Sequence, residues 1–171
     1  QYTLEIINQI RDLTNTRFTR PESSEPIICS VMNFKGGVGK SMTSLLLLQY
    51  LAINGLKVLG VDLDSQATLT TWFGFIPDID LNEDDTLATT LLEDENDITR
   101  VIRKTYFTGI DLVPANLELQ NAELILPSLS DEKIRELGSP LKRLKLALEK
   151  IKSNYDVIII DCPPNTGALT M

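Results

Sequence analysis

The apolar residues of this chain fall into two patterns, and the first is a set of short, nearly uninterrupted runs. Such runs occupy 27–31, 57–62 and 155–161, and a fourth, at 109–114, is closed by a proline. Runs of this length that are rich in Val and Ile are typical of strands buried on both faces of a parallel sheet. The pattern therefore predicts several such strands.

The second pattern is the helical spacing of apolar residues in the segments that precede and separate these strands. Thr3 suits the N-cap of the first helix, and Gly55 suits the position just after the end of the second. A strand, a helix and a second strand in this order form a right-handed crossover, which places both strand C-termini at one edge of the sheet. The predicted fold class is α/β, a parallel sheet flanked by helices. Helices are predicted at 3–15, 41–54, 67–73, 86–92, 98–105, 116–126 and 139–152.

The segment 16–26, which contains two prolines and two serines, reads as a linker. The sequence thus predicts an upstream helix and linker over 1–26 and one α/β domain over 27–171. Because Gln1 is not a start methionine and Met171 closely follows a strong motif, both ends are expected to be cut, with the C-terminal part of the domain missing.

A glycine-lysine loop lies between the first strand and the second helix. Successive backbone N–H groups and a helix N-terminus in such a loop converge on a phosphate group. Lys40 adds a charge for the β- and γ-phosphates, and Ser41 adds a hydroxyl for Mg²⁺. We therefore expect ATP and Mg²⁺ to bind at Lys35, Gly36, Gly37, Val38, Gly39, Lys40, Ser41 and Met42.

This loop departs from the standard phosphate-binding motif in one respect. The position of the usual first glycine is Phe34, and an extra lysine, Lys35, follows it. The strict motif therefore fails. The observed order, Lys-Gly-Gly-x-Gly-Lys-Ser, resembles the deviant Walker A loop of the ParA/MinD family of ATPases.

Three aspartates at strand ends complete the candidate site. Asp161 ends the clearest apolar run and is the candidate that holds Mg²⁺ through its waters. A carboxylate is also needed to orient a water toward the γ-phosphate. Asp64 is favoured for this role because it lies one step beyond its strand, and Asp62 is the alternative. The competing interpretation of Asp64 is a turn residue ahead of a short helix.

Composition narrows the function classes further. The 171 residues are 43% hydrophobic and 23% charged, as in soluble globular proteins, and no run is long enough to cross a membrane, so we expect a cytoplasmic protein. The absence of histidine excludes most hydrolases in which a histidine activates a nucleophile. Phosphoryl transfer does not require a histidine. Cys29 and Cys162 lie in apolar runs, where a free thiol usually acts as a small hydrophobe.

The net charge of the chain argues against nucleic-acid binding by the molecule as a whole. The formal net charge is -8, so DNA binding would require a local basic patch. The helix at 139–152 carries Lys142, Lys145 and Lys152 on one face, with Arg143 and Lys150 beside it; a solvated surface is favoured over a nucleic-acid contact. Between 78 and 97 the chain has nine carboxylates and no basic residue, again more typical of a solvated face than of a partner site.

The resemblance to the ParA/MinD family extends over most of the chain, through the motifs at 34–41, 61–66 and 158–164. It implies that Lys35 reaches the nucleotide of the other subunit in an ATP-dependent homodimer, and that 161–167 form a switch that senses the γ-phosphate. Further segments resemble more narrowly the RepA partition ATPases of repABC plasmids in alphaproteobacteria. These segments are 33–37, 105–107, 112–119 and 161–164.

The RepA resemblance implies an ATPase that segregates low-copy plasmids together with a ParB-type partner bound to centromere DNA, and that represses its own operon. Two alternatives stay open: a MinD-like ATPase that cycles on a membrane, and an ATP-gated DNA-binding repressor with little turnover. A nitrogenase-type iron protein is disfavoured, because two strand cysteines do not supply the ligands of its cluster.

Overall fold

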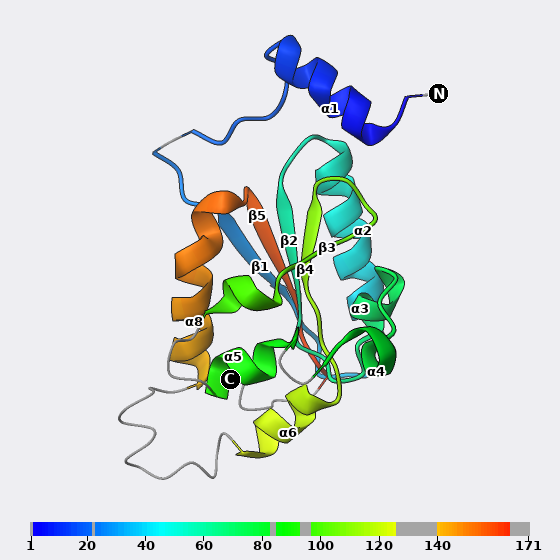
Figure 1. The fold of residues 1–171 in the computed structure, drawn as a ribbon, viewed down its shortest axis with the longest axis vertical. Helices are drawn as coiled ribbons and strands as arrows, with labels where there is room; N and C mark the ends of the chain where they lie inside the picture. Colours follow the sequence, from blue (N-terminus) through cyan, green and yellow to red (C-terminus); the bar gives the residue numbers. More distant parts are fainter. Residues whose placement is uncertain (1, 22, 83–84, 93–96, 126–139, 165–171) are drawn as a thin grey trace.

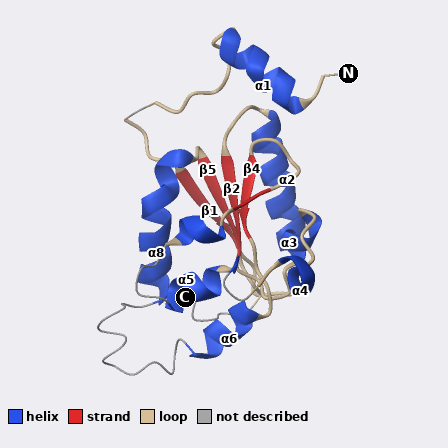
Figure 2. Ribbon diagram, viewed as in Figure 1, coloured by secondary structure: helices blue, strands red, loops and turns tan. Residues whose placement is uncertain are grey.

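Five strands form one sheet in the order β1-β5-β2-β4-β3 (Figures 1 and 2). Our computed structural model describes residues 2–21, 23–82, 85–92, 97–125 and 140–164. Strands β1, β5, β2 and β4 are parallel, and the short β3 is antiparallel to β4. The predicted α/β class with a mainly parallel sheet is confirmed. The strands are β1 (Ile27–Val31), β2 (Val58–Asp62), β3 (Arg103–Lys104), β4 (Ile110–Val113) and β5 (Val157–Asp161).

Helices cover both faces of this sheet (Figure 1). Helices α2 and α3 lie on one face, and α5, α6 and α8 lie on the other. Most predicted helices are found, with bounds shifted by one or two residues. The helices are α1 (Leu4–Leu13), α2 (Lys40–Ile53), α3 (Thr68–Trp72), α4 (Pro77–Asp80), α5 (Leu87–Leu92), α6 (Glu118–Ile125) and α8 (Pro140–Ile151), with 3₁₀ turns η2 (Ile98–Val101) and η4 (Lys152–Asn154).

The helix predicted at 98–105 is wrong. Only the turn η2 forms, and the chain then pairs with β4 through β3. Gly109, with a φ of +89°, permits the tight turn, and the Thr105 hydroxyl donates to the carbonyl of Ile110 at 2.9 Å. Pairing with the edge of the sheet therefore replaces a second helical turn.

The environment of β5 explains why its sequence is apolar throughout and does not alternate between apolar and polar residues. Val157 and Ile159 pack with α2 and α3, whereas Ile158 and Ile160 pack with the helices of the opposite face. Each face of the strand is thus buried in a separate cluster, as expected for a parallel sheet covered on both sides.

Close approach of α2 to the sheet depends on Gly60 in β2. A Cβ atom at this position would lie 3.0 Å from Cδ1 of Leu48 and 3.1 Å from Cδ1 of Leu112. Both contacts are shorter than ordinary van der Waals separations. Glycine therefore lets Leu48 of α2 fit against the sheet, which holds the helix that follows the glycine-lysine loop.

The edge strand β1 is more exposed than its sequence suggests. Ile27 is 63% exposed and Ile28 is 44% exposed. Cys29 is also exposed, so the prediction that it acts as a buried small hydrophobe is wrong, whereas Cys162 is buried as predicted; both are free thiols. The reason is position, because among the described strands β1 has a neighbour on only one side.

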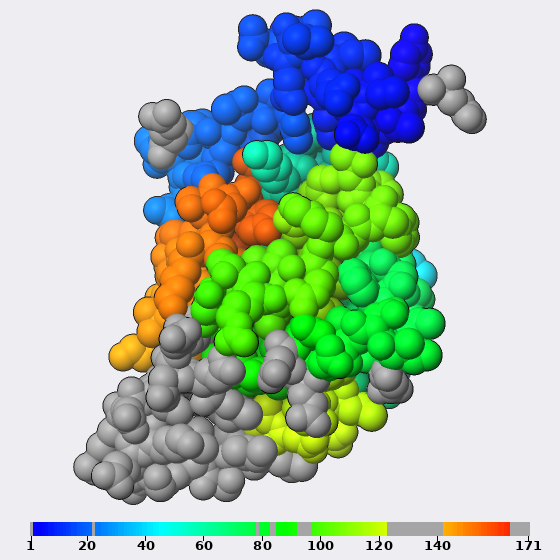
Figure 3. Space-filling view, viewed as in Figure 1, coloured from blue at the N-terminus to red at the C-terminus, as the bar shows by residue number. Residues whose placement is uncertain are grey.

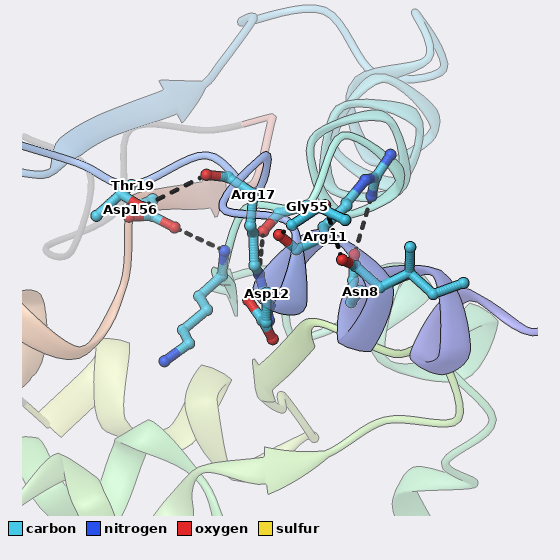
Figure 4. A network of polar contacts seen from close by, with 10 residues as sticks. Asn8, Arg11, Asp12, Arg17, Thr19, Gly55 and Asp156 are labelled. Atoms are coloured by element: carbon cyan, nitrogen blue, oxygen red, sulfur yellow. Dashed lines mark hydrogen bonds and ion pairs between the residues drawn. The ribbon is translucent and has the colours of Figure 1, made fainter.

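Helix α1 lies against one end of the sheet-containing part of the molecule (Figure 3). Thr3 caps it as predicted, accepting the N–H of Ile6. Two arginines connect this segment to the end of α2 (Figure 4): Arg11 donates to the carbonyl of Ile53 at 2.9 Å, and Arg17 donates to that of Gly55 at 2.9 Å. Cationic side chains thus satisfy carbonyls at a helix C-terminus.

Replacing both Arg11 and Arg17 with alanine should speed amide hydrogen exchange in α1 at least about tenfold, because an isolated helix of this length is marginal in water. Most apolar side chains of α1 are exposed and do not pack on the domain. The two arginine hydrogen bonds are therefore main contacts between the α1 segment and the rest of the protein. Exchange measured by mass spectrometry tests this, with Lys104→Ala as a surface control. Unchanged protection of α1 would show that other contacts hold it.

The basic face predicted on the last helix is only partly solvated. Lys145 is exposed, but Arg143 is only 4% exposed and does not belong to a surface patch. Lys152 lies within 2.6 Å of a Glu25 carboxylate oxygen, in an ion pair with the linker. None of the helices that the structure describes is long and apolar enough to cross a membrane.

Candidate nucleotide-binding site

The candidate site lies at the edge of the sheet where three parallel strands end. In the strand register Asp161 of β5 is paired with Val31 of β1 on one side and with Asp62 of β2 on the other. Since β5 lies between β1 and β2, its last residue is next to both the glycine-lysine loop and the loop that carries Asp64. The fold thus brings together the residues predicted from three separate motifs.

The glycine-lysine loop is open and ends at the start of α2. Gly37 and Gly39 have φ values of +71° and +85°, in the left-handed region that favours glycine. A Cβ atom added at Gly36, Gly37 or Gly39 would meet nothing within 4 Å. Space beside the backbone, together with a helix N-terminus, is what an anion needs in order to reach backbone N–H groups.

The two lysines of the loop lie in different surroundings. Lys40 is half-buried at the first position of α2, whereas Lys35 is exposed ahead of the glycines. The backbone N–H of Lys35 donates to Oδ1 of Asn33 at 2.9 Å, which fixes the start of the loop. Val38 and Met42 are exposed beside it, at 44% and 45%.

Asp161 is fully buried at the end of β5. Its Oδ1 accepts a hydrogen bond from the Ser44 hydroxyl at 2.9 Å, while Oδ2 is buried without a partner among the described residues. Burial raises the pKa of Asp161, although the nearby hydroxyls of Ser41 and Ser44 and the charge of Lys40 oppose the increase. An unsatisfied, buried carboxylate oxygen needs a partner, which the described part of the chain does not supply.

A magnesium ion is a suitable partner for this oxygen. Mg²⁺ prefers oxygen ligands and keeps several waters, so one or two carboxylates together with substrate phosphates are sufficient to bind it. The donor set of Asp161 and Ser41 fits this requirement. No group of three His, Cys, Asp or Glu side chains suited to a metal occurs within the described ranges, so a dedicated all-protein cage is not seen there.

The two candidate aspartates after β2 differ in accessibility. Asp62 is fully buried, and burial raises its pKa to about 7 despite hydrogen bonds from Thr70 that lower it. Asp64 is half-buried, and its Oδ1 accepts the N–H of Gln66 at 3.0 Å. Of the two, only Asp64 is partly accessible to solvent. Its contacts with the N–H groups of Gln66 and Ala67 are also those of a turn residue, so its role in orienting a water stays a prediction.

Two polar residues of this region were missed in the sequence. Ser44 binds Asp161, and Thr70 binds Asp62. A signal for Ser44 did exist, since it lies one helical turn after Lys40 and is a lone polar residue on the sheet-facing side of α2. Thr70 carries no comparable signal, because it is one of three threonines within α3.

A parallel sheet with a glycine-lysine loop between a strand and a helix, and an aspartate at the end of the adjacent strand, defines a P-loop NTPase. The family model described as an AAA domain matches residues 26–171. This match spans the whole sheet and excludes only the upstream segment.

Curated relatives agree with this class. A relative named as a replication protein A, from Sinorhizobium fredii (strain NBRC 101917 / NGR234), is 41% identical over 145 residues, which cover 84% of this chain and 36% of that protein. Protein SopA of Escherichia coli (strain K12) is 39% identical over 171 residues, covering 99% of this chain and 44% of SopA. The chain thus spans less than half the length of these two relatives.

Solved structures share the fold. A cobyrinic acid a,c-diamide synthase from Mycobacterium smegmatis, determined with an ATP analog and magnesium, has a TM-score of 0.72 and 34% identity, covering 85% of this chain and 54% of that one. A plasmid partition protein from Borrelia burgdorferi has a TM-score of 0.64 and 30% identity, covering 85% and 59%. The chain belongs to the ParA/MinD family of P-loop ATPases.

Proposed function

We propose that this chain is the nucleotide-binding part of a ParA-type partition ATPase that binds and hydrolyses ATP with Mg²⁺ in the cytoplasm. The observation that carries the proposal is the buried Oδ2 of Asp161, which has no partner within the described ranges and lies beside an open glycine-lysine loop. A carboxylate oxygen with no partner among the described residues and an open glycine-lysine loop in one place are what a magnesium nucleotide would satisfy together.

Binding in this proposal depends mainly on the loop. Backbone N–H groups from Gly36 to Met42 donate to the phosphate oxygens, and the N-terminus of α2 favours their negative charge. Lys40 contributes a positive charge toward the β- and γ-phosphates. Its half-buried position at the start of the helix keeps this charge near the loop.

Hydrolysis requires a water aligned with the γ-phosphate, and we assign its orientation to Asp64. The carboxylate is partly accessible, and the N–H of Gln66 holds one of its oxygens. Ser41 and Asp161 would hold Mg²⁺, which when bound neutralises charge on the phosphates. Lys35, outside the protein's own phosphate cradle, is assigned to the nucleotide of a second subunit in an ATP-dependent homodimer.

The biological role of this site is proposed from the relatives. The plasmid partition protein of Borrelia burgdorferi supports a function in DNA segregation. The partners in this proposal are a ParB-type centromere-binding protein and DNA. Repression of its own operon belongs to the same proposal. DNA contacts are assigned mainly to regions outside this chain.

The decisive experiment measures ATP hydrolysis by the full-length protein, alone and with DNA and its ParB-type partner. A partition ATPase should show slow basal hydrolysis that the partner and DNA increase. Stimulation by lipid vesicles instead would favour a membrane-cycling ATPase, and no turnover under any condition would favour an ATP-gated repressor.

Replacing Asp64 with alanine should reduce kcat by about 100-fold or more while the ATP dissociation constant changes little, because the water loses its orientation but the phosphate cradle is intact. Asp64→Asn is the informative companion, since an amide oxygen can still accept the N–H of Gln66. Equal losses in both variants would assign the effect to the carboxylate charge. Normal turnover in Asp64→Asn would instead indicate a role confined to loop structure.

A further inference from the structure

A continuous series of buried and partly buried hydrogen bonds connects Ala115, two residues after β4, to the backbone of Asp64. The N–H of Ala115 donates to Oγ1 of Thr70 at 2.9 Å, and the Thr70 hydroxyl donates to Oδ2 of Asp62 at 2.7 Å. Oδ1 of Asp62 then accepts the N–H of Asp64 at 3.1 Å. The side chains of Thr70 and Asp62 and the residue Ala115 are all fully buried.

The side-chain oxygens of Thr70 and Asp62 all have partners inside the protein. Thr70 binds Oδ2 of Asp62 a second time through its backbone N–H, at 2.9 Å. Both oxygens of Asp62 are therefore occupied inside the protein, and neither is available to water or substrate. Its position at the end of β2, two residues before Asp64, suits it to hold the loop rather than to take part in chemistry.

Only a hydroxyl can perform the function of the Thr70 side chain at this point. It donates to a carboxylate and accepts from a backbone N–H at the same time. Valine has nearly the same shape but offers neither interaction, and would leave the N–H of Ala115 and one bond to Asp62 unsatisfied in a buried place. Serine retains both interactions.

The Ala115 end of this hydrogen-bond series is also held in place by a neighbouring contact. Ala115 is followed by Asn116, whose side-chain oxygen accepts the N–H of Glu118 at the start of α6 at 3.0 Å. The start of α6 and the loop that carries Asp64 are thus connected through Thr70 by hydrogen bonds that are buried at Thr70 and partly buried at the two ends. Rigid support of this kind is needed where a group must be held within a fraction of an ångström.

We infer that Thr70 and Asp62 are positioning residues that fix the Asp64 loop against the end of β4 and so set the rate of ATP hydrolysis without contributing to ATP affinity. This inference rests on the proposed function of Asp64. It assigns to a threonine of α3 a role in turnover that does not require contact with the nucleotide.

The test compares Thr70→Val with Thr70→Ser in the full-length protein. Thr70→Val should reduce kcat by between about tenfold and 100-fold with an unchanged ATP dissociation constant, and Thr70→Ser should stay close to the unsubstituted protein. Thr86→Val is the matched control, because Thr86 is equally buried and its hydroxyl has no hydrogen-bond partner among the described residues. Turnover of Thr70→Val equal to that of Thr86→Val would overturn the inference.

A second measurement does not depend on hydrolysis. In Thr70→Val, the amide NMR signal of Asp64 should shift and the amide of Ala115 should exchange faster, whereas Thr86→Val should change neither. If Thr70→Val does not fold, Asp62→Asn provides the same test, since an amide cannot accept bonds from both Thr70 and Asp64. An unperturbed Asp64 amide would refute the positioning role, while absent ATP hydrolysis in the unsubstituted protein would refute only the proposed function.

Discussion

Replacement of Lys40 by alanine is expected to weaken ATP binding by the full-length protein by about tenfold to 100-fold, the usual value of hydrogen bonds to a charged group. Lys40 is the first residue of α2 and is half-buried beside the glycines. Its removal takes away the one cation placed at the start of this helix. Isothermal titration calorimetry with ATP and Mg²⁺ measures the effect directly.

Lys57→Ala is a suitable control for the Lys40 variant. Lys57 is exposed just before β2, at the end of that strand opposite to the one that carries Asp62, and its substitution removes the same charge far from the loop. The backbone N–H of Lys57, which donates to Asp156 at 2.8 Å, is retained in the variant. Unchanged affinity in Lys40→Ala would show that the loop does not bind the phosphates as proposed.

Replacement of Lys35 by alanine is expected to give a different result: ATP still binds, but the ATP-dependent dimer does not form and hydrolysis is lost. Lys35 is exposed and precedes Gly36 and Gly37, so it lies outside the cradle formed around Lys40. We therefore expect it to reach phosphate charge only across an interface, in a dimer held together by two nucleotides.

Light scattering or sedimentation of Lys35→Ala with ATP separates this role from that of Lys40. The unsubstituted protein should double its mass when ATP is added, and Lys35→Ala should stay monomeric at ATP concentrations that saturate it. Lys145→Ala, which removes an exposed lysine of α8, should dimerise normally. A normal ATP-induced dimer in Lys35→Ala would make Lys35 an ordinary loop lysine.

The parts of the site that could be predicted are those encoded by local patterns. The glycine-lysine loop follows a strand and starts a helix, and Gly37 and Gly39 adopt the left-handed conformations that such a loop requires. Asp161 follows an apolar run that forms a buried strand. The roles assigned to these residues in catalysis are still predictions, but their convergence at one sheet edge follows from the parallel topology.

The parts that could not be predicted depend on the order of strands. The sequence does not reveal that β5 lies between β1 and β2, and this order places Asp161 beside Ser44, which is 117 residues away in the chain. The same order leaves Ile27 and Cys29 exposed on the edge strand, although their pattern is that of a buried one. Pairing with β4 likewise removed a helix that propensity alone favoured at 98–105.

The arginine contacts hold the C-terminal end of α2, and the phosphate loop lies at its other end. Its 14 residues span about 21 Å as a single rod, with Lys40 at one end and the carbonyl bound by Arg11 at the other. A rod that is stiff on this scale transmits a tilt at one end to the other. The two arginines therefore attach the α1 segment to the end of α2 that lies farthest from the phosphate loop.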